Sequence, residues 1–248
     1  MAQVFPSYAN TLAKLSLILG AGSPFAIFYL GSTITRSPLN TNVDVPLGQP
    51  VPFSHKHHAF ELGIDCRYCH WNVEKGPMAG VPGAEVCMSC HSQIWTNSPL
   101  LEPVRQSYAT GTPLVWQKVN KVPEFVYFDH SIHIARGINC NVCHGPVTKM
   151  QITWKGKYFA MAWCLECHRE PERFLGPNTT NPDLSPQEQA FDLYKKAQAG
   201  EKLSTAEFNI LHDKTHSATQ EELEKGRALL KKYGLNKQQL EDCSICHR

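Results

Sequence analysis

The chain has 248 residues, of which 42% are hydrophobic, and its formal net charge is +2. A chain of this length is expected to form one or two domains. The near balance of charge lacks the strongly basic character that indicates nucleic-acid binding, so we expect no nucleic-acid partner. The ten cysteines are the most informative part of the composition, because they occur at regular positions.

The N-terminal segment has the properties of a membrane anchor. Leu15 to Ile34 is a run of twenty residues without a charge, with one basic residue close to each end. About twenty apolar residues span a bilayer as one helix. A cleaved signal peptide is the alternative, but this run is long for a signal and no clear Ala-x-Ala cleavage site follows it. We predict that residues 1–36 form a retained single-pass transmembrane anchor.

The stretch from Phe53 to His70 introduces the pattern that dominates the rest of the chain. It reads FSHKHHAFELGIDCRYCH and ends in Cys-x-x-Cys-His. This motif is typical of c-type haem attachment: the two thiols form thioethers to one porphyrin, and the histidine lies under the iron as its proximal ligand. The stretch recurs at Phe128 to His144 as FDHSIHIARGINCNVCH. Both copies therefore share a Phe-x-His-x-x-His element upstream of an attachment motif.

Five such motifs contain all ten cysteines, and each motif has two cysteines and one histidine. The motifs are Cys66, Cys69 and His70; Cys87, Cys90 and His91; Cys140, Cys143 and His144; Cys164, Cys167 and His168; and Cys243, Cys246 and His247. Zinc sites also use paired cysteines, but they give no reason for a histidine after every pair, and five pairs cannot be divided among four-cysteine sites. A thioredoxin-like motif would occur once, beside a βαβ pattern. We predict five covalently bound haem c groups.

The fold that follows is mainly α with long loops, because five porphyrins would occupy much of the interior. Residues 37–175 are predicted to form a tetrahaem region with an internal two-haem repeat. The first two motifs begin 21 residues apart, and the third and fourth begin 24 residues apart. Within it, Trp116 to Phe128 alternates apolar and polar residues and is predicted to form a short strand. Residues 176–248 are predicted to hold a helical insertion and the C-terminal fifth haem.

The insertion, Ser185 to Tyr233, is charged and contains no cysteine. Three helix start signals, each a Ser or Thr followed three residues later by Glu, and two glycine stops divide it into three helices. The start signals are at Ser185, Ser204 and Thr219, and the stops are Gly200 and Gly234.

Covalent haem attachment in bacteria takes place outside the cytoplasm. Because each side of the apolar run has one basic residue, the positive-inside rule does not predict the orientation of the helix in the membrane. We therefore expect a protein of the inner membrane whose haem domain, residues 37–248, lies on the periplasmic side.

Distal ligands are the next requirement, because a haem iron that does not bind substrate is capped on both faces. Of twelve histidines five are proximal, which leaves seven. The strongest candidates repeat with the motif: His55, His58, His130 and His133. His57 has no counterpart in the second copy, where Ile132 stands, and is expected to contact a propionate or solvent.

A fifth distal ligand is less clear from the sequence. Met150 is the preferred candidate, and Met161, His212 and His216 are the alternatives. Axial methionine raises the reduction potential of a haem relative to two histidines. Four low-potential haems and one higher one would suit a relay that ends at a more oxidising partner.

The order of these elements resembles the membrane-anchored pentahaem cytochrome c subunit of bacterial alternative complex III, a quinol:electron-acceptor oxidoreductase. The matching stretches are FSHKHH, GIDCRYCH, EVCMSCH, WQKVNKVPEFVYFDHSIH, GINCNVCHG, VTKM, MAWCLECHREP and CSICHR. They cover Phe53 to Pro171 and the last six residues. The His-x-x-His element also looks like that of class III multihaem cytochromes, which implies class III-like haem packing.

The resemblance implies ligand pairs and partners. His55 would serve the haem on His70, and His130 the haem on His144, while His58 and His133 would serve other haems of the set. The implied partners are an iron–sulfur or molybdopterin-like periplasmic subunit, a polytopic quinol-binding membrane subunit, and a monohaem cytochrome c or blue-copper acceptor.

The function favoured by the sequence is that of an electron-transfer subunit, not an enzyme, which relays electrons from menaquinol oxidation to a periplasmic acceptor. It requires no catalytic residue. One alternative is a stand-alone membrane-anchored quinol dehydrogenase that feeds a periplasmic reductase. A multihaem enzyme that reduces nitrite, sulfite or hydroxylamine is disfavoured, because enough spare ligands exist to cap all five irons.

Overall fold

The structure, a computed structural model, describes residues 4–175, 183–212 and 218–247. The chain divides into two compact units, one that ends at Val43 and one that begins at Asp44. The boundary predicted between residues 175 and 176 adjoins residues outside the described ranges, and the three-part division stays a prediction.

The first unit consists of α1 (Ala9–Arg36), a helix of 28 residues, and the short α2 (Pro38–Thr41). α1 continues through Pro24, has no buried residue, and is long and apolar enough to be a candidate membrane span. Its polar side chains suit lipid as well, because their hydroxyls donate to carbonyls of the same helix. These are Ser16, Ser23, Thr33 and Thr35.

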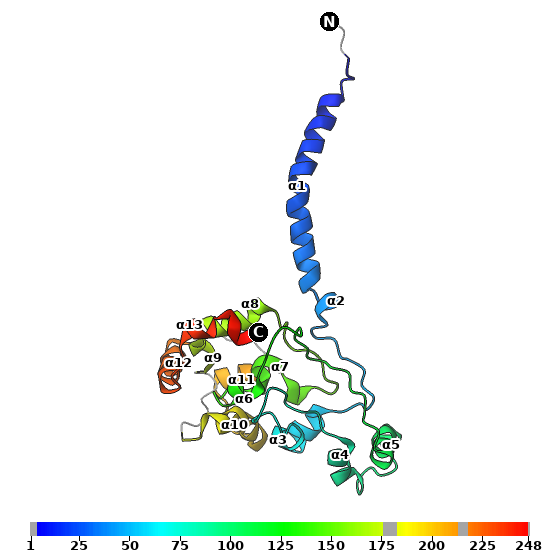
Figure 1. The fold of residues 1–248 in the computed structure, drawn as a ribbon, viewed down its shortest axis with the longest axis vertical. Helices are drawn as coiled ribbons and strands as arrows, with labels where there is room; N and C mark the ends of the chain where they lie inside the picture. The colour runs from blue at the N-terminus through cyan, green and yellow to red at the C-terminus, as the bar shows by residue number, and fades with distance from the viewer. Residues whose placement is uncertain (1–3, 176–182, 213–217, 248) are drawn as a thin grey trace. The chain divides into compact units, whose positions relative to one another are not determined.

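The second unit is built from short helices joined by long loops (Figure 1). Its helices are η1 (Lys56–Glu61), α3 (Cys66–Cys69), α4 (Ala84–His91), η2 (Pro99–Leu101), α5 (Glu102–Thr110), α6 (His130–Ile134), α7 (Cys140–His144), η3 (Val147–Lys149), α8 (Met161–Arg169), α9 (Glu172–Leu175), α10 (Pro186–Ala199), α11 (Thr205–Leu211), α12 (Gln220–Lys232), α13 (Lys237–Leu240) and α14 (Cys243–Cys246). In the described ranges there is no strand, only an isolated antiparallel bridge between Pro46 and Trp154. The predicted fold class, mainly α with long loops, is confirmed.

The strand predicted for Trp116 to Phe128 is wrong. This segment has no neighbouring strand, so its backbone groups find other partners. The Gln117 amide donates to the side chain of Gln49 and its carbonyl accepts from the same side chain, at 2.9 and 3.0 Å. Further along, the Tyr127 amide donates to the carbonyl of Cys246 at 2.8 Å. Alternating residues alone do not make a strand where no partner edge exists.

The apolar core of the second unit is small and includes attachment cysteines. One cluster consists of Val73, Ile134, Ala190 and Phe191, with Cys66 and Cys140 packed against it. A second consists of Val51, Ala84 and Val104, with Cys87 against it. The polypeptide alone therefore supplies little conventional core, as expected for a chain that wraps porphyrins.

The three helices predicted in the insertion are confirmed as α10, α11 and α12. Reciprocal capping boxes are complete at the starts of α11 and α12, where the Ser204 and Thr219 side chains cap the helix and the Glu three residues on bonds back. Gly200, after α10, has a φ of +72°, the left-handed conformation in which glycine ends helices readily.

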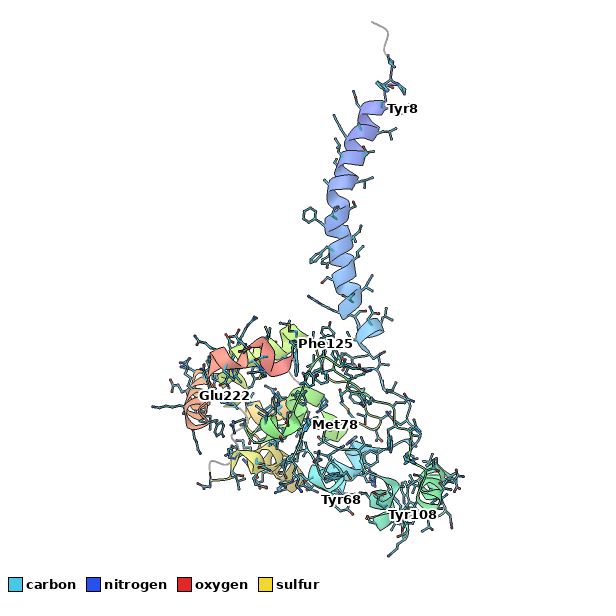
Figure 2. The ribbon with its side chains drawn as sticks, in the orientation of Figure 1. Tyr8, Tyr68, Met78, Tyr108, Phe125 and Glu222 are labelled. Carbon is cyan, nitrogen blue, oxygen red and sulfur yellow. The ribbon has the colours of Figure 1, made fainter. Side chains whose placement is uncertain are left out.

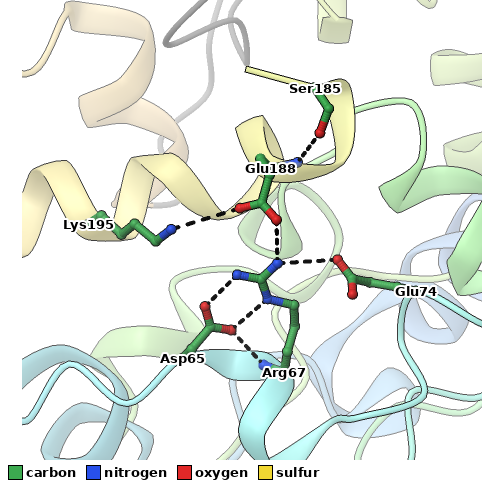
Figure 3. A network of polar contacts seen from close by, with 6 residues as sticks. All are labelled: Asp65, Arg67, Glu74, Ser185, Glu188 and Lys195. Atoms are coloured by element: carbon green, nitrogen blue, oxygen red, sulfur yellow. Dashed lines mark hydrogen bonds and ion pairs between the residues drawn. The ribbon is translucent and has the colours of Figure 1, made fainter. Parts of the chain in front are cut away.

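The first turn of α10 forms half of the predicted capping box: the Ser185 hydroxyl accepts from the Glu188 amide, but the Glu188 carboxylate binds elsewhere (Figure 3). The Glu188 carboxylate accepts from the Arg67 guanidinium at 2.7 Å. Arg67 also bonds Asp65 and Glu74, and it lies 4.3 Å from the ring centre of Phe191. These hydrogen bonds lower the pKa of the Asp65 carboxyl. The insertion is thus joined to the first cysteine motif by one shared arginine.

α12 packs tightly against α9 through a glycine. A Cβ atom at Gly226 would lie 2.0 Å from the carbonyl oxygen of Glu172, so only glycine permits this approach of the two backbones. Because α9 follows the fourth motif in the chain, this contact holds α12 of the insertion against the segment next to that motif.

We expect Gly226→Ala to destabilise the haem-loaded protein by about 1–3 kcal/mol through overpacking, although alanine favours an isolated helix by about 1 kcal/mol. Urea unfolding followed by far-UV circular dichroism measures the change. Lys225→Ala, an exposed residue on the same helix, is the control and should change stability by less than about 0.5 kcal/mol. A Gly226→Ala protein more stable than the wild type would contradict this packing.

Candidate haem-binding sites

The local sequence places each cysteine motif on one turn of helix. In three motifs the residue before the first cysteine is an Asp or Asn that caps the turn by accepting a hydrogen bond from the amide two residues on. The pairs are Asp65 with Arg67, Asn139 with Asn141, and Asp242 with Ser244. The other two motifs end the longer helices α4 and α8. Because the second cysteine and the histidine follow the first cysteine by three and four residues, all three lie on one side of the turn.

The ten cysteines are free thiols. In the parts of the chain that the structure describes, no group of three or more His, Cys, Asp or Glu side chains could hold a metal ion. The paired thiols are thus not gathered into four-cysteine sites of the zinc type.

Four pairs of histidine rings face one another at nearly the same separation. The ring centres are 6.4 Å apart for His55 and His70, and 6.2 Å apart for His58 with His91, His130 with His144, and His133 with His168. Each pair joins one motif histidine to one histidine of a His-x-x-His element. The structure therefore brings together the two pairs that the resemblance implied, His55 with His70 and His130 with His144. It also places His58 opposite His91 and His133 opposite His168.

This separation matches the distance expected between the ring centres of two imidazoles that bind the same metal from opposite sides. A bond of about 2 Å from metal to imidazole nitrogen, with about 1 Å more to each ring centre, places the two centres about 6 Å apart. Ordinary aromatic contacts cover a similar range of distances. The regularity is more informative, because the same gap recurs four times and always between a motif histidine and an upstream histidine. These pairs fit haem iron with two axial histidines.

Hydrogen bonds orient the rings so that Nε2 is left for a metal. In seven of the nine histidines in or beside the motifs, Nδ1 donates to a backbone carbonyl, an arrangement that is typical of ligating histidines. The residues are His58, His70, His91, His130, His133, His168 and His247. His55 Nδ1 instead lies 3.1 Å from the Thr153 hydroxyl, a partner that sequence reasoning missed.

A phenylalanine holds each His-x-x-His element in the same way. Phe53 stacks on His58 at 4.5 Å and meets His55 edge-on at 5.0 Å. Phe128 repeats this arrangement with the second and first histidines of its own copy, at 4.7 and 4.8 Å. The recurrence of this phenylalanine at the start of both copies is the sequence signal for a role that its neighbours in the chain do not reveal.

Burial keeps these imidazoles neutral, the form that binds a metal. It lowers the pKa of His55 to about 4, helped by the nearby His70, and lowers the pKa of His144 to about 4, helped by His130. The pKa values of His58 and His133 are lowered mainly by burial as well. His57, by contrast, has a side chain that is 46% exposed and lies 3.0 Å from the Glu61 carboxylate.

The fifth motif has a phenylalanine beside its histidine. His247 Nδ1 donates to the Phe125 carbonyl at 3.1 Å, and the two ring centres are 5.8 Å apart. The residue opposite His247 stays a prediction. Met150, the preferred candidate, is fully buried, and its carbonyl accepts from the Lys56 amide, next to the first His-x-x-His element.

The alternatives to Met150 differ in placement. His212 is engaged at both ring nitrogens, by the Phe208 carbonyl and the Lys149 amine. His216 lies outside the described residues. Met161 is 62% exposed and stands one turn before Cys164, whose pKa is raised in part by the neighbouring Cys246 of the fifth motif. Of the described candidates, Met161 is thus on the helix that adjoins the fifth motif.

We expect Phe128→Leu to alter two sites, because its ring contacts histidines that face His144 and His168. Electron paramagnetic resonance (EPR) of the oxidised protein measures this as shifts in two low-spin signals. Phe125→Leu, which removes a ring from His247 alone, is the matched control and should shift one signal. If Phe128→Leu alters no more signals than the control, the shared role of the phenylalanine is wrong.

Known proteins agree with this chemistry. The model of the cytochrome c552 family matches residues 106–237, just over half of the chain, a range that includes the third and fourth motifs. The multihaem cytochrome c subunit of the menaquinone reductase of Nitratidesulfovibrio vulgaris is 29% identical over 154 residues, an alignment that covers 54% of this chain and 73% of the relative. The chain is a multihaem c-type cytochrome related to that subunit, and it belongs to the cytochrome c552 family.

Proposed function

We propose that this chain is the pentahaem electron-transfer subunit of a membrane quinol oxidoreductase similar to alternative complex III. The observation that carries the proposal is the set of four histidine pairs, each as wide as one metal held between two imidazoles. When bound, haem iron supplies one-electron exchange. The ten motif cysteines would hold the porphyrins, and the five motif histidines would be the proximal ligands.

The chain's own residues explain why no substrate reaches the metal at four of the sites. His55, His58, His130 and His133 each lie opposite a motif histidine, so that a haem held between them would have no open face. Their Nδ1 hydrogen bonds and the two phenylalanines fix the orientation of these rings. Such rigid capping suits electron exchange and requires no acid, base or nucleophile.

The membrane supplies the context of the proposal. α1 is suited to anchor the chain in the inner membrane, with the haem-binding unit on the periplasmic side, where haem is attached. The proposed partners are an iron–sulfur or molybdopterin-like periplasmic subunit and a polytopic quinol-binding subunit. A monohaem cytochrome c or a blue-copper protein would accept the electrons. The name of the Nitratidesulfovibrio relative, a menaquinone reductase subunit, supports membership of a quinone-linked complex.

The alternative is that the anchored chain oxidises quinol by itself and feeds a periplasmic reductase. The single candidate span next to a multihaem unit is compatible with this role. The two functions differ in whether the chain needs a separate quinol-binding subunit.

Purification in mild detergent, followed by subunit identification and mass spectrometry, tests the proposal. We expect the mature chain to carry five haem c groups and to co-purify with a polytopic membrane subunit. The complex should oxidise a menaquinol analogue, and the separated chain should not.

Two results would contradict the proposal. A mature chain with fewer than five haems would overturn the pentahaem assignment. Oxidation of the analogue by the separated chain, with no other subunit present, would favour the stand-alone dehydrogenase.

A further inference from the structure

The five motifs contact one another in an order that differs from their order in the sequence. The first and second motifs meet through their central residues. The Tyr68 hydroxyl lies 2.8 Å from the Ser89 hydroxyl, and both residues stand between the two cysteines of their own motif.

The first motif also meets the third. Cys66 and Cys140 pack against the same apolar cluster, which includes Phe191. His130, which faces the third motif, donates to the carbonyl of Pro77 in the loop after the first motif, at 2.7 Å. The first motif therefore lies between the second and the third.

The third and fourth motifs are joined by helix α6. Its two histidines are one turn apart, and they face His144 and His168 respectively. Phe159 adds a second link, because its ring contacts both His144 and Trp163 of the fourth motif's helix, at 6.1 and 5.3 Å.

The fourth and fifth motifs meet through α13. His168 Nδ1 donates to the Leu240 carbonyl at 2.9 Å, and Arg169 forms an ion pair with Glu241 at 3.1 Å. Leu240 and Glu241 stand just before the fifth motif in the chain. Tyr68 of the first motif and Phe125 beside the fifth lie apart within the second unit (Figure 2).

The ends of this series differ from its middle. Cys90 of the second motif and Cys243 of the fifth are the two exposed cysteines, and the other eight are partly buried. In Figure 1 the helices of the first four motifs follow one another through the second unit as α4, α3, α7 and α8.

From these contacts we infer that the five attachment motifs form one unbranched line in the order second, first, third, fourth, fifth, so that electrons enter and leave at the second and fifth motifs. The inference rests on the proposed function, which places a haem at every motif. Electron exchange falls steeply with distance, so each haem exchanges mainly with those of the adjacent motifs. The redox partners of the chain would therefore approach the second and the fifth motif, and the third would be the centre of the relay.

Distal-ligand replacement in the haem-loaded full chain tests the order. His58→Met should raise the potential of the site on His91, and charge interactions should then shift the potentials of its spatial neighbours. Because this site is at an end, one other site should shift, that on His70. His130→Met alters the site on His144 in the middle, and the sites on His70 and His168 should both shift.

Redox titration monitored by EPR reads each site separately. The two rings of His58 and His91 cross at 66°, whereas those of His55 with His70 and of His130 with His144 are within 8° of parallel. The ring angle changes the shape of a low-spin signal, so the site on His91 can be identified. Ile132→Met, at the exposed position of the second copy that corresponds to His57, is the matched control and should shift no site.

The linear order is overturned if His58→Met shifts the sites on His144 or His168 as much as the site on His70, or if His130→Met shifts one neighbour only. Should a variant fail to load haem, magnetic coupling in the partly reduced wild-type protein gives the same information. The signal of the site on His91 should be coupled to one neighbour, and coupling to two would contradict the order. A wild-type chain with fewer than five haems would instead refute the proposed function.

Discussion

The structure depends on pairs of imidazole rings whose separation leaves room for one metal ion between them. Each of these pairs joins two separate helices or loops of the chain, such as His133 on α6 and His168 near the end of α8, whose ring centres are 6.2 Å apart. The polypeptide has little apolar core of its own, and a metal bound by each pair would hold together segments that are otherwise joined by long loops. In the proposed holoprotein, coordinate bonds and porphyrin faces supply the cohesion that a sheet or a helical bundle provides elsewhere.

The parts of the site that could be predicted from sequence are the local ones. A Cys-x-x-Cys-His fits on one helical turn, and an Asp or Asn before it caps that turn, so the motif specifies its own geometry. The repeated Phe-x-His-x-x-His element identified the four upstream histidines because two copies could be compared. The helices of the insertion were predictable for the same reason, since capping boxes such as Ser204 with Glu207 act within four residues.

What could not be predicted depends on contacts between distant segments. Nothing near His58 in the chain shows that its ring faces His91, and nothing near Thr153 shows that it supports His55. The strand expected at Trp116 to Phe128 failed because no partner strand exists, a fact that the segment itself does not contain. Glu188 left its predicted capping box because Arg67, remote in sequence, offered a stronger charged partner. The ligand opposite His247 is undecided by sequence for the same reason.

In each His-x-x-His element one phenylalanine contacts both histidines, and these two histidines face the motif histidines of two different sites. Two such elements therefore serve the first four motifs, which fall into two similar halves. The fifth motif has no His-x-x-His element of its own and follows a helical insertion that contains no cysteine. The fifth motif therefore relies on other contacts, and the residues around Leu240 join it to the fourth motif.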